Sequence, residues 1–399
     1  MFRPHQRVYL TAFLLDAAVM VVFATTPFFV FNQIGGNEAM AGVVGAVQMG
    51  AYALSCLGSA GFVSQTKHGL RWALLGVGLF IFFSSLMPLY PNFIFCVVVS
   101  FLSFAALGLV WPALHSWIGA EPDAAHRARH MAYFNIAAGC GFALSPLLGG
   151  PLYDSDFRLP FVALVFLGTL IAALIGSLPH EKESPETVAE ESSEQEAGST
   201  AKLLVAWCAV FVTNVLIGAT RSIYPKRVMG LLDTGELRFL AEQTAPSFLG
   251  DAPATTFSWL VSTLWIATAM CFFIMGRKQH WHHKMALLLW LQVLAGLAMW
   301  VLGYTQSLGM MILCFALIGV NFGVSFFVAM SYSLADPMHK HRRAATTEGT
   351  LGAGAFAGSI AFGYLAGSFG VTAPFLYAPV FVGLGIALQL LLLRRRQPT

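Results

Sequence analysis

Residues 120–150, AEPDAAHRARHMAYFNIAAGCGFALSPLLGG, decide the fold: a short basic loop runs into a glycine-rich apolar segment. Part of this pattern returns 215 residues later. A constant offset over separate segments predicts that two copies of one structural unit fill the chain. The matching pairs are Ala120 and Ala335, Pro122 and Pro337, His126 and His341, Arg127 and Arg342, Gly139 and Gly354, Gly108 and Gly323, and Gly61 and Gly276.

Composition places the chain in a lipid bilayer. Of its 399 residues, 57% are hydrophobic and 10% are charged, and the mean hydropathy is +0.71. A soluble protein carries roughly 25% charged residues, so this much apolar surface belongs in a membrane. The net charge of +3 is small and dispersed, which argues against nucleic-acid binding. The six cysteines fall singly in apolar runs, so we expect neither a metal site nor a disulfide framework.

The N-terminal segment is basic and then apolar, as in a cleaved signal peptide or a first transmembrane helix. Asp16 interrupts the apolar run, and no small-residue cleavage site closes it. The run is also as long as a membrane span. We therefore expect a retained first transmembrane helix.

Twelve apolar runs are long enough to cross a bilayer as helices, which takes about 20 residues. Most lysines and arginines of the connecting segments fall on the side that holds the N-terminus. By the positive-inside rule we expect both termini in the cytoplasm, and a bacterial inner (plasma) membrane as the location. The runs cover about residues 8–32, 38–62, 72–90, 93–118, 131–153, 159–178, 203–226, 257–276, 285–304, 309–333, 347–369 and 373–393.

The expected fold is all-α, with twelve transmembrane helices in two pseudo-symmetric six-helix bundles, residues 1–179 and 201–399. Residues 180–200 between them are rich in glutamate and lack aromatic residues, which predicts a solvated cytoplasmic linker. We interpret the linker as a passive tether rather than a regulatory element. A second polar segment, residues 226–256, is expected outside, with a short surface helix around Gly235–Gln243.

Two parallel-related halves joined by a charged segment resemble the major facilitator superfamily, whose members bind substrate near the midplane and work by alternating access. The loop GFVSQTKHGLR, residues 61–71, is similar to the gate loop after the family's second helix. Gly61, Gly69 and Arg71 keep the glycines and the basic character of that loop. Gln65 stands where the family has an acid, which puts the usual salt bridge within the loop in doubt.

The fifth span carries a glycine pattern that resembles the superfamily's antiporter motif. Gly141, Pro146, Gly149 and Gly150 match it, whereas Ser145 replaces one glycine. Small residues let helix backbones approach closely, and a proline can kink a helix. Simple close packing explains the pattern as well as antiport does, so both interpretations stay open.

Asp16 is the main candidate for ion coupling. A charge at membrane depth costs about 2.5–3.5 kcal/mol on insertion scales, and Asp16 falls near the middle of the first span. It is either a proton carrier or substrate anchor, or a structural carboxylate bonded to a neighbouring helix. We favour the functional interpretation, because the resemblance implies that the first helix lines the cavity.

Other candidates divide into substrate-binding residues and a gate residue. A polar side chain at mid-depth bonds a substrate or an adjacent helix, and an aromatic ring stacks on a ligand or packs. Arg221 binds an anionic substrate, pairs with Asp16 in one state, or snorkels to the interface. Glu348 is expected in the first turn of its helix, where the helix dipole stabilises an acid, as a gate or cap. The substrate-binding candidates are Gln48, Trp111, Asn214, Arg221, Trp265 and Asn321.

The chain has no Walker A loop and no G-x-S-x-G or H-E-x-x-H motif. We therefore expect neither an ATP-driven pump nor an enzyme, and no cofactor. The tract His280–His283 lies in a basic loop without acids, so we do not expect it to bind a metal. The leading hypothesis is a monomeric secondary transporter that exports a small amphipathic compound in exchange for protons. The alternatives are a proton symporter or an exchanger for a polar metabolite or organic anion, and a non-transporting sensor or scaffold.

Overall fold

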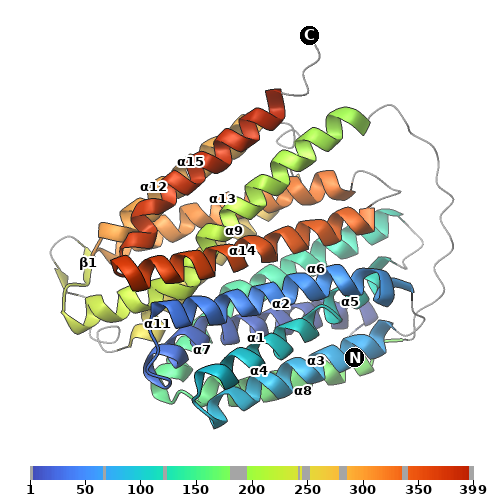
Figure 1. Cartoon of the computed structure of the whole chain (residues 1–399). Helices are drawn as coiled ribbons and strands as arrows, with labels where there is room; N and C mark the ends of the chain where they lie inside the picture. The colour runs from blue at the N-terminus through green and yellow to red at the C-terminus, as the bar shows by residue number, and fades with distance from the viewer. Residues whose placement is uncertain are drawn as a thin grey trace.

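The computed structural model describes residues 3–65, 69–119, 124–179, 196–240, 243–244, 252–277, 285–334 and 340–394, which are almost wholly helical (Figure 1). The first half contains α1 Pro4–Asn32, α2 Glu38–Gln65, α3 Gly69–Leu86, the 3-10 helix Met87–Leu89, α4 Phe93–Leu107, α5 Val110–Gly119, α6 Ala124–Leu144, α7 Pro146–Ser155 and α8 Leu159–Gly176. The second half contains α9 Glu196–Asp233, β1 Arg238–Leu240, β2 Gln243–Thr244, α11 Pro253–Arg277, α12 Met285–Tyr304, α13 Leu308–Leu334, α14 Lys340–Phe369 and α15 Ala373–Arg394.

Twelve candidate membrane spans occur among these described residues, six before residue 177 and six after residue 200. The prediction of a twelve-helix, all-α membrane fold is therefore confirmed. The repeat is visible in the architecture as well, because α6 and α14, which carry Gly139 and Gly354, begin the fifth span of the first half and form the fifth span of the second. Residues 180–195 of the expected linker lie outside the described residues, and α9 begins within the linker's last residues.

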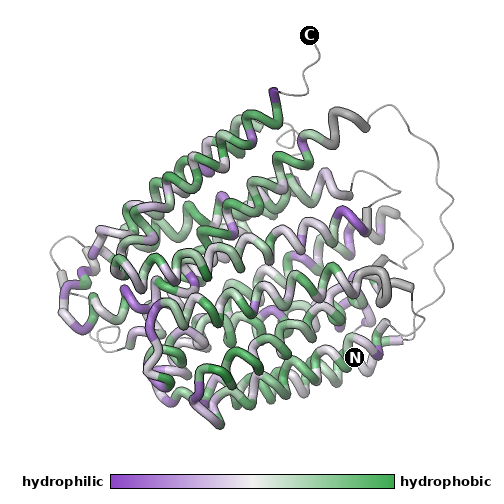
Figure 2. The backbone as a smooth tube through the Cα atoms, in the orientation of Figure 1, coloured by the Kyte–Doolittle hydropathy of each residue, from purple (hydrophilic) through white to green (hydrophobic). Residues whose placement is uncertain are grey.

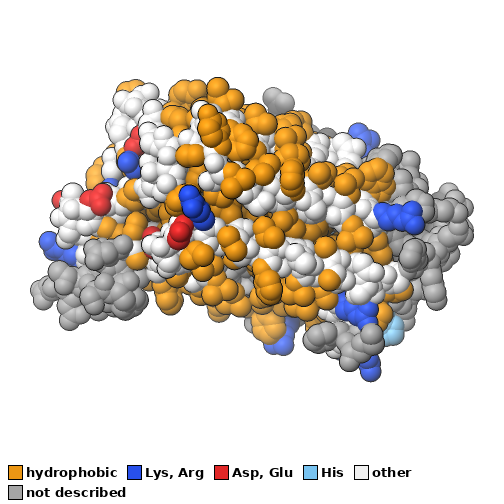
Figure 3. Space-filling model, turned by 90° about the horizontal axis from the view of Figure 1, so that it is seen from below, with side chains coloured by type: hydrophobic (Ala, Val, Ile, Leu, Met, Phe, Trp, Pro, Cys, Tyr) orange, Lys and Arg blue, Asp and Glu red, His pale blue; other side chains and the backbone are white. Residues whose placement is uncertain are grey.

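The outer surface of the helix bundle is apolar. Hydrophobic residues run along most of each helix, and hydrophilic residues gather toward the helix ends (Figure 2). In the face shown in Figure 3, hydrophobic side chains cover the middle of the molecule. Large side chains such as Phe166, Trp290 and Leu148 are more than half exposed. A water-facing surface would not tolerate this, so these side chains face lipid.

Two of the spans are interrupted helices. The fifth breaks at Ser145, between α6 and α7, where the sequence predicts a kink at Pro146. The fourth breaks between α4 and α5 beside Gly108, which was not predicted. A Cβ atom at Gly108 would lie 2.6 Å from the Cβ of Ser55 on α2. The bend at Gly108 therefore allows α4 to approach α2 at backbone distance.

The polar segment after α9 differs from the prediction. The helix continues past Pro225 and ends at Asp233, and Gly235 in the turn that follows has a left-handed φ of +66°. The expected surface helix around Gly235–Gln243 is wrong: β1 and β2 form a short antiparallel pair there. The backbone N–H of Arg238 donates to the carbonyl of Gln306 at 2.9 Å, so the connection before α13 holds this segment extended.

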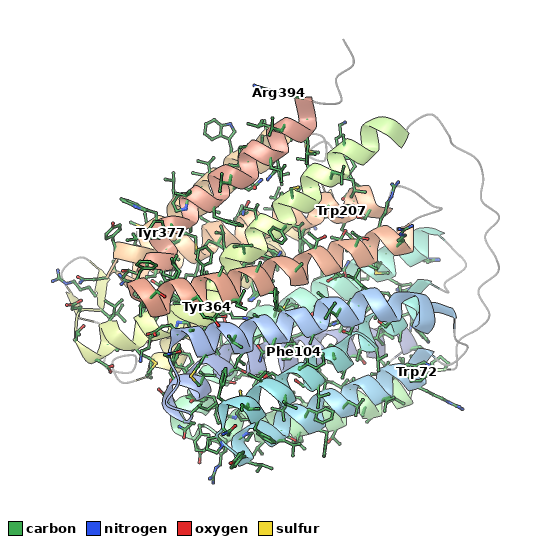
Figure 4. The ribbon with its side chains drawn as sticks, viewed as in Figure 1. Trp72, Phe104, Trp207, Tyr364, Tyr377 and Arg394 are labelled. Atoms are coloured by element: carbon green, nitrogen blue, oxygen red, sulfur yellow. The ribbon has the colours of Figure 1, made fainter. Side chains whose placement is uncertain are left out.

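The buried core reveals how the two halves meet. We call the end of the bundle that holds Pro4 and Arg394 the terminal end, and the other the opposite end; Figure 4 labels Arg394 at the tip of α15. One cluster, which includes Phe28 and Tyr153 from the first half and Phe257 from the second, joins both halves near the opposite end. Toward the terminal end, each half has a separate core. The halves are therefore packed together at the opposite end.

Two buried glutamines tie α12 to α15. Gln292 Nε2 donates to Gln389 Oε1 at 3.0 Å, and Gln389 Nε2 donates back to Gln292 Oε1 at 2.8 Å. Both side chains are 0% exposed. Each amide thus satisfies the other in an apolar setting.

Replacing one of these glutamines is expected to destabilise the protein more than replacing both. Gln389→Leu leaves the Gln292 amide without its main partner, which costs about 1–3 kcal/mol, whereas two leucines remove both polar groups. Thermal unfolding in detergent should therefore show a lowered midpoint for Gln389→Leu and partial recovery in the double variant. Additive losses in the double variant would contradict this account.

Candidate functional site

Asp16 lies in the interior of the first half, on a helix that is buried on nearly every side. The side chain is 2% exposed, and its Oδ1 atom has no hydrogen-bond partner among the described residues. Buried polar groups in folded proteins are nearly always paired. This oxygen therefore makes no structural hydrogen bond to a described neighbouring helix, and the role of Asp16 in ion coupling stays a prediction.

A second acid, Glu348 on α14, lies close enough to Asp16 for the two charges to interact. The hydroxyl of Tyr52 on α2 donates to Glu348 Oε2 at 3.1 Å, which links the two halves. The predicted position of Glu348 in a first helical turn is wrong. Because α14 begins at Lys340, Glu348 lies more than two turns inside the helix, where the dipole of the helix end has faded.

Arg221 lies on α9 where this helix meets α1 and α2. Its Nη2 donates to the carbonyl oxygen of Gly45 at 2.8 Å. Its guanidinium carbon lies 4.1 Å from the ring centroid of Phe23, a cation–π contact. The predicted pairing with Asp16 does not occur in this conformation, and these contacts with the first half differ from those of a snorkelling interfacial arginine.

The three polar candidates at mid-depth are buried and bonded within their own halves. Gln48 Nε2 donates to Thr26 Oγ1 at 3.3 Å, which joins α2 to α1. Asn321 Nδ2 donates to Thr213 Oγ1 at 2.8 Å, and Asn214 Nδ2 donates to the carbonyl of Val210 at 2.8 Å. Asn321 Oδ1 has no hydrogen-bond partner within the described ranges. Substrate contact by these side chains stays a prediction.

Of the two aromatic candidates, Trp265 joins the halves. Its ring stacks on Phe142 of α6, with centroids 4.7 Å apart, and meets Phe322 of α13 edge-on at 5.4 Å. Trp111 stays within the first half, where it meets Phe134 at 6.1 Å. Sequence reasoning missed Tyr52, Phe23 and Phe142.

The glycine pattern of the fifth span brings helices into backbone contact. A Cβ atom at Gly141 would collide with the carbonyl oxygen of Phe13, one turn from Asp16. A Cβ atom at Gly150 would lie 2.6 Å from the carbonyl oxygen of Ala254 on α11. Pro146 begins α7. The pattern therefore packs the fifth span against the Asp16 helix and against the other half.

Gly141 and Gly149 offer a matched test of this packing. Gly141→Ala is expected to destabilise the protein by about 1–3 kcal/mol, because overpacking forces the backbones of α6 and α1 apart. Gly149→Ala should be tolerated, since its nearest neighbour, Val21 Cα, would lie 3.6 Å away. Thermal unfolding in detergent checks both variants. Equal midpoints for the two would show that the close approach at Gly141 does not constrain the fold.

Part of the predicted gate loop falls outside the described residues. Gly61 and Gln65 belong to the end of α2, but their surroundings are not described, and residues 66–68 are not described at all. Gly69 is buried and Arg71 exposed at the start of α3. The role of this loop as a gate stays a prediction. The tract His280–His283 also lies outside the described residues.

The family model of the Major Facilitator Superfamily matches residues 8–240. A search of curated protein sequences finds no match.

Three solved structures illustrate the likeness of fold. A POT family transporter in complex with 5-aminolevulinic acid has a TM-score of 0.74 at 14% identity, covering 99% of this chain and 96% of that chain. A bacterial homologue of the human lysosomal transporter Spinster, inward-facing and unoccupied, has a TM-score of 0.72 at 14% identity, with 99% and 98% covered. The nucleoside transporter NupG has a TM-score of 0.70 at 14% identity, with 100% of both chains covered.

Proposed function

Because the chain belongs to the major facilitator superfamily of secondary transporters, we propose that it couples transport to protons. In this proposal Asp16 binds the coupling proton. The cargo is a small amphipathic compound that leaves the cell. The observation that carries the proposal is the buried Asp16 side chain in the first half, whose Oδ1 has no hydrogen-bond partner among the described residues. A buried acid without a partner is costly to keep charged. Proton binding removes that charge. The protonation state of Asp16 therefore changes the electrostatic energy of the helices packed around it.

The surroundings of Asp16 support a link between proton binding and the relative position of the halves. Glu348 on α14 interacts with the charge on Asp16 and accepts the hydrogen bond of Tyr52 on α2. A change of charge at Asp16 therefore acts on a contact that crosses between the halves. Gly141 holds α6 against the turn of α1 that carries Asp16, so the same change reaches the fifth span.

Export by antiport rests on the glycine pattern of the fifth span and on the apolar, aromatic side chains between the halves. Trp265, Phe142 and Phe322 suit a cargo with an apolar body. Both termini lie in the cytoplasm of a bacterial cell in this proposal, which follows the positive-inside rule. The shared core at the opposite end then closes the outer side, and the protein works as a monomer.

The experiment that tests this function records internal pH in proteoliposomes while amphipathic cations, sugars and organic anions are added outside. At least one compound should move protons across the membrane, and its effect should vanish in Asp16→Asn. Protons that leave as the compound enters indicate antiport, and protons that enter with it indicate symport. Compound-driven proton movement that persists unchanged in Asp16→Asn would overturn the assignment of Asp16.

A further inference from the structure

Arg221 occupies a junction of helices from both halves. It extends from α9 in the second half to the carbonyl of Gly45 and the ring of Phe23 in the first half. Next to it, Ser222 Oγ donates to Ser359 Oγ of α14 at 3.0 Å. The guanidinium therefore lies where α1, α2, α9 and α14 meet, in the part of the molecule that alternating access rearranges.

Within the described part of the chain, Arg221 makes no ion pair with an acidic side chain in this conformation. Among the residues that the structure describes, its side-chain contacts are the carbonyl of Gly45 and the ring of Phe23. A buried charge without a counter-ion is strongly unfavourable unless something else compensates it. One carbonyl oxygen and one aromatic ring compensate this charge only weakly. The Arg221 guanidinium can therefore bind an anion that is not part of the chain.

The guanidinium also has N–H groups that the hydrogen bond to Gly45 does not use. Five N–H groups are available on an arginine, and Nη2 makes the hydrogen bond to Gly45. Among the described residues, the hydrogen bond to Gly45 is the one that the guanidinium makes, and the residue as a whole is partly accessible. Two parallel N–H bonds of one guanidinium match the two oxygens of a carboxylate or phosphate.

Close packing lies beyond Arg221 on the side of the opposite end. A Cβ atom at Gly42, one turn from Gly45, would lie 2.7 Å from the Cα of Gly363 on α14. The backbones of α2 and α14 are therefore in contact there, and the shared core continues that closure. This contact separates Arg221 from the opposite end of the bundle.

From these contacts we propose that Arg221 is the anion-binding residue of the transport site and that the amphipathic cargo carries a carboxylate or phosphate group. The inference rests on the proposed transport function and narrows its substrate class. The anionic group binds the free donors of Arg221, and the apolar body of the cargo packs against aromatic rings such as Phe23. Arg221 then binds the anionic group of the cargo, while Asp16 binds the proton.

The test compares ligands that differ only in charge. Purified protein is titrated with matched acid and amide pairs, phenylacetate with phenylacetamide and octanoate with octanamide, and with phenyl phosphate, and binding is followed as the rise in thermal unfolding midpoint. Anions should stabilise the wild-type protein more than their neutral partners. Arg221→Gln should bind the anions about 10- to 100-fold more weakly, the loss expected for a charge-assisted hydrogen bond, with the amides unchanged.

Three variants make the result specific. Arg221→Lys keeps the charge without the fork, so it should retain phosphate binding better than carboxylate binding. Arg394→Gln removes an exposed arginine at the end of α15 and should bind like the wild type. Asp16→Asn should still bind anions even though it no longer moves protons, which separates this inference from the proton assignment. Equal binding of acids and amides by the wild type, or unchanged anion binding in Arg221→Gln, would overturn the role of Arg221.

Discussion

Asp16→Asn should reduce substrate-driven proton movement to that of empty liposomes while substrate-for-substrate exchange continues. Asparagine has nearly the shape of the protonated acid but cannot take up or release a proton. The site is 2% exposed, so no bulk water replaces the lost carboxyl. The measurement records internal pH and radiolabelled substrate exchange on the same vesicles.

Asp233 at the end of α9 provides the matched control for this experiment. It is exposed, so Asp233→Asn removes the same charge without touching the core and should leave both signals intact. If Asp16→Asn abolished exchange together with proton movement, Asp16 would be needed for the fold or for substrate binding. If it abolished neither, another group would carry the proton.

A disulfide between α2 and α14 at the opposite end should stop transport completely. A Cβ atom at Gly367 would lie 3.5 Å from the Cβ of Ala39, within the usual range of about 3.5–4.5 Å for disulfides. Ala39→Cys with Gly367→Cys should therefore cross-link under mild oxidation. Alternating access needs the halves to separate at this end in part of each cycle, so transport should fall to the rate of empty vesicles and return on reduction.

The controls for the cross-link are Ala39→Cys alone and Gly367→Cys alone, treated with the same oxidant. They are needed because the native chain has six free cysteines of its own. Both single variants should transport at the wild-type rate with and without oxidant. Mass spectrometry of the digested protein verifies that the cross-link has formed. Transport at full rate by a fully cross-linked double variant would show that α2 and α14 do not separate at this end.

The membrane fold was predictable because each span is a continuous, mainly apolar run in the sequence. The helix ends were harder, since tertiary contacts decide them. Hydropathy drops at Lys226, yet α9 continues to Asp233 because Val228 and Leu231 are buried and Arg227 Nη2 donates to the carbonyl of Thr305 at 3.1 Å. The extended β1 segment likewise depends on the backbone hydrogen bond from Arg238 to Gln306. No local sequence pattern predicts this bond.

The site was predictable where a residue contrasts with its surroundings. Asp16 and Arg221 are charges in apolar runs, so the sequence marks both. The sequence does not distinguish Tyr52, Phe23 or Phe142, because each is one aromatic residue among many. The Tyr52–Glu348 bond joins residues far apart in the chain, and the pairing of Arg221 with Gly45 in place of Asp16 depends on how the halves meet.

Proton coupling is tested most directly by asking whether a pH gradient alone drives a compound uphill. Proteoliposomes with equal compound on both sides receive an imposed pH gradient, and the internal concentration is followed over time. The account predicts that the wild-type protein builds a concentration difference whereas Asp16→Asn keeps the two sides equal. Equal concentrations with the wild-type protein, for a compound that it demonstrably exchanges, would contradict proton coupling.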